Sequence, residues 1–236
     1  MYKRILLKVS GEQLQGQYEG GFDAERAKWV AGEVKKALDQ GVQVVVMVGG
    51  GNYARGAQLA GHGIGRVTAD NIGMMATIMN AIALTDVLND QGVPARALSI
   101  VTADQVVDQF THRRAISHLE KGRVVVAAGG TGRPFVTTDT AAVSFALELD
   151  CDVILKATKV DGVYDRDPAK FPDATKYDQL TYQAALENDD VKVMDKAALG
   201  LAMEQGQTII VFDLLKEGNI ARVAEGQVVG TRISAS

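Results

Sequence analysis

The stretch VVVMVGGGNYARG, residues 44–56, decides the fold. It starts with five apolar residues, four of them β-branched, and such a run favours a buried strand. Gly49, Gly50 and Gly51 follow at once; without a Cβ they let a ligand lie directly against the backbone N–H groups. Arg55 can add a planar fork of donors to the same anion. The stretch therefore favours a phosphate-binding loop, with a tight structural turn as the alternative.

The residues before this stretch predict a βαβ unit. Lys3–Val9 is apolar and β-prone and stops at a Ser-Gly pair, as a central strand does. Asp23 stands at an N-cap position, and apolar residues then recur at helical spacing through Leu38. A second strand, Val42–Val48, leads into the glycines. Because the strands of a βαβ unit are parallel, both strand ends lie at the same edge of the sheet.

Lys8 is unusual because it lies near the end of a strand that should be buried. A buried ammonium group is costly unless it reaches water or an anion. Lys8 either extends to the surface or points at a bound phosphate beside Ser10 and Gly11. Asp139, which opens a later helix, either complements the helix dipole or holds Lys8 in place.

Composition limits the class of protein. A chain of 236 residues fits one α/β domain, residues 1–236. Its net charge of −4 excludes a general attraction to nucleic acid or acidic lipid, so an anion site must be local. The lone Cys151 fits a reducing compartment and a buried position. The first apolar run, Ile5–Leu7, is too short for a signal peptide or a membrane span, and we expect a cytoplasmic protein.

The middle of the chain continues the α/β pattern. A helix predicted over Asn71–Leu88 is apolar on most of its circumference, which indicates either a subunit contact or a central position. Asp70 is either its cap or a ligand for hydroxyl groups. The segment Gly61–Arg66 fails the dinucleotide pattern because its last position is an arginine, and no P-loop pattern is present.

Two later strand ends are also rich in polar groups. The strand Val124–Ala128 is followed by glycines and by the threonine-rich loop from Thr131 to Asp139. The strand Asp152–Leu155 is followed by the charged stretch from Lys156 to Asp167, in which Tyr164 could face a base. Ligands of open α/β sheets collect at the carboxyl ends of strands, so both stretches are candidate nucleotide sites.

Five motifs together resemble the series found in bacterial uridylate (UMP) kinases, which have the amino-acid-kinase fold. They occur in order over essentially the whole chain: Lys8-Val-Ser-Gly11, Val48-Gly-Gly-Gly-Asn52, Thr131-Gly-Arg-Pro-Phe135 with Thr137-Thr-Asp139, Lys156-Ala-Thr-Lys-Val-Asp-Gly162 and Lys192-Val-Met-Asp195. The resemblance implies a three-layer αβα sandwich around a mainly parallel sheet. It also implies transfer of the γ-phosphate of ATP to UMP with Mg²⁺, a homohexamer, activation by GTP and inhibition by UTP.

The resemblance also implies roles for individual residues. Lys8, Arg55 and Asp139 are the expected catalytic residues. The residues expected to bind ATP are Lys8, Val9, Ser10, Gly11, Gly51, Arg55, Thr158, Tyr164 and Asp167. The residues expected to bind UMP are Gly50, Asp70, Thr131, Gly132, Arg133, Pro134, Phe135, Val136, Thr137 and Thr138. Mg²⁺ is expected to be carried mainly by the phosphates of ATP.

The chain departs from the family pattern in places. Its loop Gln17–Asp23 lacks the family's Gly-Phe-Gly-Ile-Asp order, which bears on the response to GTP. Near Asn188–Val191 the chain is one residue longer than the family form, which bears on the role of Asp195. Arg133 is also unusual for the family.

Two other functions remain open on the sequence. An amino-acid or carbamate kinase would share the fold, although Asp70 and the threonine loop suit a nucleotide better. A non-catalytic nucleotide-sensing oligomer would not need Lys8, Arg55 and Asp139 together.

Overall fold

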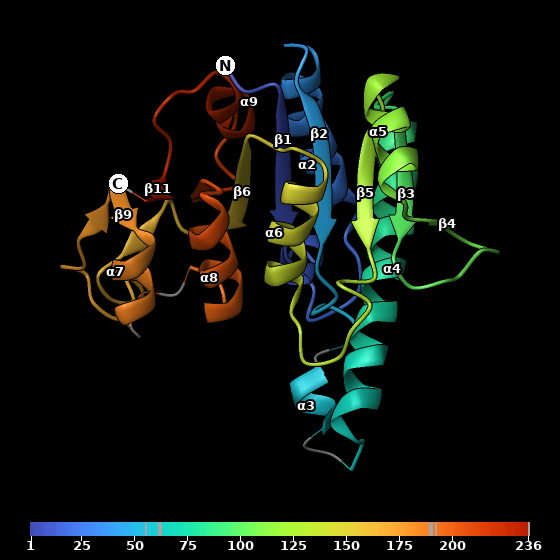
Figure 1. Cartoon of the computed structure of the whole chain (residues 1–236), viewed down its shortest axis with the longest axis horizontal. Helices are drawn as coiled ribbons and strands as arrows, with labels where there is room; N and C mark the ends of the chain where they lie inside the picture. Colours follow the sequence, from blue (N-terminus) through green and yellow to red (C-terminus); the bar gives the residue numbers. More distant parts are fainter. Residues whose placement is uncertain (55, 61–62, 189–190, 192, 236) are drawn as a thin grey trace.

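The computed structural model describes residues 1–54, 56–60, 63–188, 191 and 193–235. A mixed sheet of nine strands runs through this part of the chain, in the order β4-β3-β5-β2-β1-β6-β10-β11-β9 (Figure 1). Its strands are β1 Arg4–Val9, β2 Gln43–Val48, β3 Ala95–Ser99, β4 Asp108–Gln109, β5 Val124–Ala128, β6 Val153–Thr158, β9 Gln179–Thr181, β10 Ile209–Asp213 and β11 Thr231–Ser234. A separate hairpin pairs β7 Val163–Tyr164 with β8 Lys176–Tyr177.

The sheet is parallel throughout except at the β10–β11 pair, which confirms the mainly parallel sheet that the family resemblance implies. The central strands β1, β2 and β5 are buried on both faces, which explains why they read as continuous apolar runs without alternation. All the central strands therefore end at one edge of the sheet.

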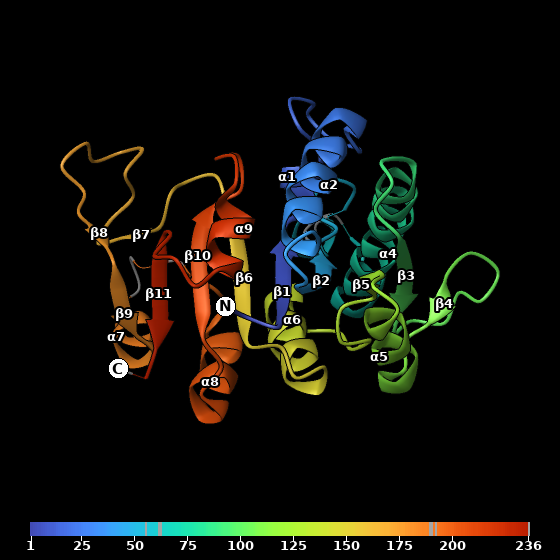
Figure 2. The ribbon, with the colours of Figure 1, turned by 90° about the horizontal axis from the view of Figure 1, so that it is seen from above.

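Helices cover both faces of the sheet, which confirms the three-layer sandwich (Figure 2). One apolar core joins the sheet to α2 Ala24–Leu38, α4 Arg66–Asp90 and α9 Asn219–Ala224. The other core joins it to α5 His112–Glu120, α6 Thr138–Glu148, α7 Tyr182–Glu187 and α8 Lys196–Gln205. Two helices are short: α1 Gly11–Leu14 directly follows β1, and α3 Gly56–Ala60 directly precedes α4.

Helix α2 forms for the reasons visible in the sequence. The carboxylate of Asp23 accepts the N–H of Glu25 at 2.9 Å and caps the helix. Val30 and Val34 on its inner face are fully buried. The prediction of a capped amphipathic crossover helix is confirmed.

Helix α4 is longer than predicted, because it begins at Arg66 and not at Asn71. Gly65 is its N-cap and Asp70 lies in its second turn, so the interpretation of Asp70 as a helix cap is wrong. The Thr-Ala-Asp segment before Asn71 has no strong apolar spacing, and the prediction missed this first turn for that reason.

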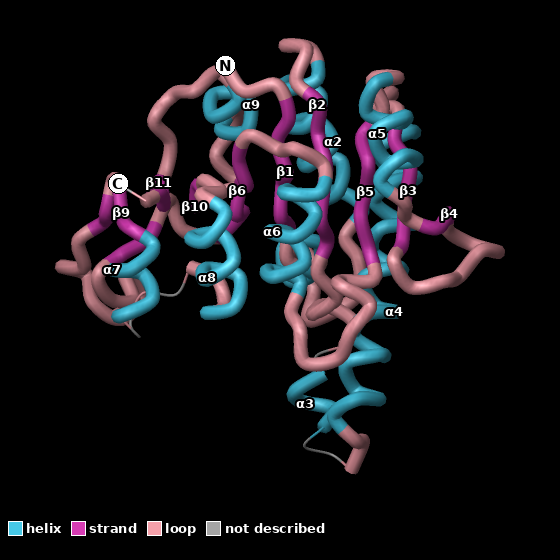
Figure 3. Tube along the Cα trace, in the orientation of Figure 1, coloured by secondary structure: helices cyan, strands magenta, loops and turns pink. Residues whose placement is uncertain are grey.

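Helix α4 has two different sides. Ile78, Ala81 and Leu84 are buried against the sheet, whereas Met75 and Met79 on the opposite side are about half exposed. Among the described residues, α4 is the one helix that is long and apolar enough to cross a membrane. Its inner side, however, packs in the core of the protein. Its first turns extend past the carboxyl edge of the sheet together with α3 (Figures 1 and 3).

Candidate active site

The carboxyl ends of the central strands bring distant segments into contact. A Cβ added to Gly11, just after β1, would lie 2.6 Å from the backbone N of Gly51, just after β2. A Cβ added to Gly49 would lie 3.0 Å from the N of Gly11. Gly49 and Gly50 have no positive φ, so these glycines provide close approach and not an unusual backbone conformation. The predicted meeting of the two strand ends is confirmed.

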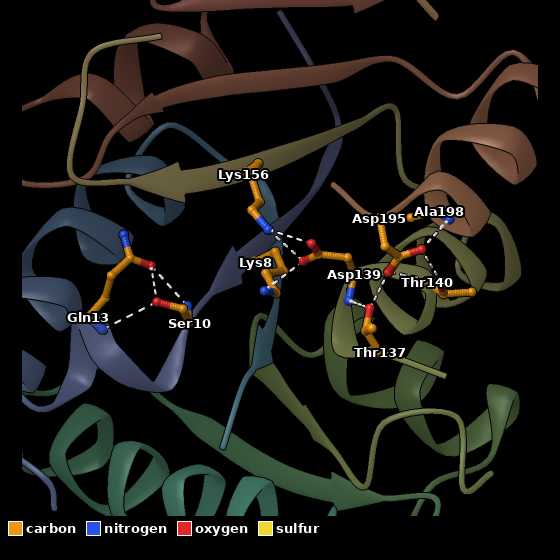
Figure 4. A network of polar contacts seen from close by, with 9 residues as sticks. All are labelled: Lys8, Ser10, Gln13, Thr137, Asp139, Thr140, Lys156, Asp195 and Ala198. Atoms are coloured by element: carbon orange, nitrogen blue, oxygen red, sulfur yellow. Dashed lines mark hydrogen bonds and ion pairs between the residues drawn. The ribbon is translucent and has the colours of Figure 1, made fainter. Parts of the chain in front are cut away.

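Lys8 and Lys156 share one carboxylate at this edge (Figure 4). The Nζ of Lys8 lies 2.6 Å from Oδ1 of Asp139, and the Nζ of Lys156 lies 2.6 Å from the same oxygen and 2.7 Å from Oδ2. Lys8 is only 5% exposed, which rules out the interpretation that it extends to the surface. The expected contact between Asp139 and Lys8 is confirmed.

Lys156 is a second cation of this site, and its role was not predicted from the sequence. Lys8 and Lys156 are register partners on the adjacent parallel strands β1 and β6. Each lies one or two residues before the end of a buried strand, and this shared position was the signal that could have identified Lys156. The site therefore contains two ammonium groups and not one.

The charges in this cluster alter its pKa values. Burial by itself would raise the pKa of Asp139, but the positive charges of Lys8 and Lys156 outweigh burial and lower it. Burial, followed by the repulsion from Lys8, lowers the pKa of Lys156 to about 8 in spite of Asp139. The cluster has a surplus of positive charge when both lysines are protonated, and this surplus suits a phosphate.

Asp139 is fixed by the start of α6 and by α8. The hydroxyl of Thr137 accepts the N–H of Asp139 at 3.0 Å and caps α6. Asp195 accepts hydrogen bonds from the hydroxyls of Thr137 and Thr140, and it caps α8 through the N–H of Ala198 at 2.8 Å. Asp195 therefore joins α8 to the segment that carries Asp139.

Ser10 lies beside Lys8 but is engaged within the protein. Its N–H donates to Oε1 of Gln13 at 2.9 Å, and its hydroxyl accepts the N–H of Gln13 at 3.3 Å. These two bonds form the capping box of α1. The N–H and the hydroxyl of Ser10 are therefore both used within the protein, and binding of ATP by Ser10 stays a prediction.

A small pocket of about 150 Å³ lies beside the loops after β2 and β5. Six of the residues predicted to bind UMP line it: Gly50, Asp70, Arg133, Val136, Thr137 and Thr138. The other four predicted residues, Thr131, Gly132, Pro134 and Phe135, are not among its lining residues. Part of the predicted loop therefore lines one pocket together with Gly50 and Asp70, and binding of UMP there stays a prediction.

Helix α4 holds the loops around the small pocket. A Cβ on Gly50 would lie 2.7 Å from the carbonyl oxygen of Gly73. Asp70 accepts the N–H of Phe135 at 2.8 Å, and the hydroxyl of Thr77 accepts the N–H of Gly129 at 2.7 Å. These contacts place one helix against both glycine-containing loops.

A larger pocket of about 510 Å³ lies along the loop that follows β6. Tyr164 and Asp167 line it, whereas Thr158 does not and bonds to the carbonyl oxygen of Phe212 at 3.1 Å. In the sheet order β5-β2-β1-β6, the strand of Lys8, β1, lies between β2 and β6. The loops after β2 and β5 line the small pocket, whereas β6, which carries Lys156, leads into the larger one.

The described residues contain no cluster of three side chains suited to bind a metal ion. Arg55 lies outside the described residues. Residues 189 and 190 do so too; they belong to the segment Asn188–Val191, in which the chain is expected to be one residue longer than the family form.

Comparisons with known proteins agree with this geometry. The model of the amino acid kinase family matches residues 3–213. A uridylate kinase of Dichelobacter nodosus (strain VCS1703A) is 48% identical over 234 residues, which cover 99% of this chain and 97% of the relative. The solved structure of a UMP kinase from Bacillus anthracis has a TM-score of 0.95 and 37% identity, covering 100% of this chain and 97% of that chain. A UMP kinase structure from Ureaplasma parvum has a TM-score of 0.91 and 34% identity, with 99% of both chains covered.

Proposed function

The chain belongs to the amino acid kinase family, and on that premise we propose that it transfers the γ-phosphate of ATP to UMP, giving ADP and UDP in pyrimidine nucleotide biosynthesis. The 48% identical relative and the two solved structures named above are uridylate or UMP kinases. The observation that carries the proposal is the cluster of Lys8, Lys156 and Asp139, which lies at the sheet edge from which the loops that line both pockets extend.

This cluster suits phosphoryl transfer. In that reaction the protein mainly positions the two substrates and offsets the charge on the transferred group. A cation about 4 Å from one phosphate charge contributes on the order of 4 kcal/mol at the effective dielectric near a protein surface. Lys8 and Lys156 supply two such cations, and Asp139 orients them. The acceptor is a phosphate oxygen that is already ionised, so the reaction needs no strong general base.

The two pockets accommodate the two nucleotides in this proposal. UMP occupies the small pocket next to Gly50, Asp70 and the loop Thr131–Thr138. The ATP phosphates lie along Lys8–Gly11, Gly51 and Arg55. The ATP nucleoside lies towards Thr158, Tyr164 and Asp167. Mg²⁺ enters with ATP as part of that substrate, and it supplies further neutralisation of the phosphate charge.

We further propose that the protein is a cytoplasmic homo-oligomer, a hexamer by the family resemblance, with GTP as activator and UTP as inhibitor. The exposed apolar side of α4, with Met75 and Met79, supports a contact with a second copy. The loop Gln17–Asp23 is the segment that bears on the GTP response.

A coupled assay with ATP and Mg²⁺ tests the function. We expect turnover with UMP that clearly exceeds turnover with CMP, glutamate, aspartate or carbamate. Turnover with an amino acid or carbamate would instead establish the first alternative function. Tight binding of UTP without any turnover would establish a nucleotide-sensing oligomer.

A further inference from the structure

Asn52 and Asn80 form a reciprocal pair of buried amides at the glycine loop, residues 49–54, which follows β2. Asn52 is 7% exposed and Asn80 is fully buried. The Nδ2 of Asn80 donates to Oδ1 of Asn52 at 2.7 Å, and the Nδ2 of Asn52 donates to Oδ1 of Asn80 at 2.9 Å. Since a buried amide is costly without partners, this mutual arrangement fixes both side chains relative to each other.

The second N–H of each amide reaches a different segment. Asn80 donates to the carbonyl oxygen of Gly49 at 2.7 Å, and Asn52 donates to the carbonyl oxygen of Gly21 at 2.6 Å. The N–H of Gly21 returns to the carbonyl oxygen of Asn52 at 3.0 Å. The amide pair, Asn52 and Asn80, therefore joins the glycine loop, helix α4 and the loop Gln17–Asp23.

The position of the glycine loop matters on both of its sides. Towards β1 it lies against Gly11, next to Lys8. Towards α4 it lies against Gly73, which lines the small pocket together with Asp70 and Thr77. A displacement of this loop would change the separation between the region proposed for the ATP phosphates and the pocket proposed for UMP.

We propose that the amide pair is a positioning device that sets the distance between the donor phosphates and the acceptor pocket, and that anchors the loop Gln17–Asp23 to this catalytic loop. The inference rests on the proposed function, because it assigns the donor and acceptor to these two regions. Neither amide is placed against the reacting phosphates, so both are positioning residues. Their directional bonds to backbone carbonyls define the loop position more narrowly than apolar packing would.

The test uses Asn80→Leu and Asn52→Leu, which keep similar volume but remove the amide. The matched control is Asn89→Leu at the far end of the same helix. Asn89 also makes amide bonds, to the carbonyl oxygens of Thr85 at 2.8 Å and Ala95 at 3.3 Å, and it accepts the N–H of Ala95 at 3.0 Å. Its removal perturbs α4 without touching the glycine loop.

Two readouts are measured on each full-length variant. For Asn80→Leu and Asn52→Leu we expect kcat to fall by about tenfold or more with smaller changes in the two KM values, because misplaced substrates lose rate more than binding. Amide hydrogen exchange should become faster in residues 18–23 and 49–54. In Asn89→Leu, kcat should stay within about threefold of the original chain, and exchange in these two segments should be unchanged.

Asn80→Asp gives a second test if the leucine variants fail to fold. An ionised carboxylate cannot donate to Gly49 and repels its carbonyl oxygen, whereas a protonated one can donate. The activity of Asn80→Asp relative to the original chain should therefore rise as the pH falls, while the relative activity of Asn89→Leu should not.

Several outcomes would overturn the inference. One is a folded Asn80→Leu chain whose kcat stays within about twofold of the original chain. Equal losses of kcat in Asn80→Leu and Asn89→Leu, or a flat pH dependence for Asn80→Asp, would also contradict it. If the original chain does not phosphorylate UMP, the proposed function fails. The exchange readout then still decides whether the amide pair holds the two loops, because it needs no substrate.

Discussion

At the scale of single residues, the two lysines and Asp139 determine what the site can do. Lys8 and Lys156 come from neighbouring strands and meet one carboxylate at 2.6 Å each. A buried carboxylate between two ammonium groups leaves one net positive charge in a region with little water. This charge attracts phosphate groups and also keeps both lysine side chains aimed in one direction.

Replacing Lys8 with methionine tests its catalytic role. Lys8→Met keeps the length of the side chain but removes the charge, so we expect kcat to fall by well over about tenfold, which corresponds to more than about 1.4 kcal/mol of barrier. Lys156 still pairs with Asp139 in this variant, and the fold should remain, as circular dichroism and thermal unfolding would show. Near-normal turnover of Lys8→Met would contradict a catalytic role for this ammonium group.

The pH dependence of activity tests Lys156. Its pKa is lowered to about 8, so it loses its positive charge as the pH rises above that value. We expect kcat/KM for ATP to decline above about pH 8, because this profile reports on groups of the free enzyme. Lys156→Arg keeps its charge at this pH, and the decline should be absent or move to higher pH. If kcat/KM declined equally in the original chain and in Lys156→Arg, a group other than Lys156 would be responsible for the decline.

The stability of the fold should behave differently over this pH range. Lys156 has a folded pKa of about 8 against an ordinary value of 10.5. Between these values the unfolded chain binds more protons at this side chain, so its contribution to the free energy of unfolding rises with pH. A loss of activity above pH 8 therefore should not be accompanied by a loss of stability from this residue.

At the scale of elements, α4 organises the small pocket. It donates to the loop after β2 through the amide of Asn80, and it accepts hydrogen bonds from the loop after β5 through Thr77 and Asp70. Gly50 allows the glycine loop to touch the helix backbone directly. The geometry of the pocket proposed for UMP thus depends on a close contact between one loop and one helix.

Gly50→Ala tests this contact. Its added Cβ would lie 2.7 Å from the carbonyl oxygen of Gly73 and 2.8 Å from the Cβ of Ala76. Because a helix backbone cannot yield easily, the loop must move. We expect the free energy of unfolding to fall by about 1–3 kcal/mol and KM for UMP to rise, as chemical denaturation and steady-state kinetics would show.

Gly32→Ala is the control for this prediction. Gly32 lies in the interior of α2, is exposed, and has no atom within 4 Å of an added Cβ. Alanine there should raise the free energy of unfolding by about 0.5–1 kcal/mol and leave KM unchanged. If Gly50→Ala proved as harmless as Gly32→Ala, the contact with α4 would not define the pocket.

At the scale of the whole molecule, the outer side of α4 bears on assembly. Met75 is 47% exposed and Met79 is 50% exposed on the same helix, next to other exposed apolar residues. A double substitution, Met75→Glu with Met79→Glu, places two charges on this surface, and burying them in a subunit contact would be costly. We expect light scattering to show a smaller particle than for the original chain, with the fold retained.

Met203→Glu is the matched control, since Met203 is 46% exposed on α8. It should leave the mass in solution unchanged. An unchanged mass for the Met75 and Met79 double variant would show that this side of α4 is not the subunit contact.

Much of the fold could be predicted from the sequence because its central strands are unusually clear. The run Val44–Val48 and the strand Val124–Ala128 are apolar on both faces and end in glycines, so they predict a buried parallel sheet with ligands at one edge. The strands β4, β7 and β8 have only two residues each, and no periodicity can identify strands so short.

The site could be predicted only in part, because its key contacts join residues far apart in the chain. Asp139 was paired with Lys8 correctly, but the role of Lys156 depends on the register of β1 with β6, which the sequence does not state. The amide pair was missed because a single asparagine within an apolar helix, such as Asn80, gives no indication of its partner.

A crystal structure with UMP, Mg²⁺ and a non-hydrolysable ATP analogue tests the central claim most directly. We predict that the Nζ atoms of both Lys8 and Lys156 lie within about 3.2 Å of phosphate oxygens, with UMP in the pocket lined by Gly50 and Asp70. Phosphates bound away from these two lysines, or UMP bound outside that pocket, would contradict the account.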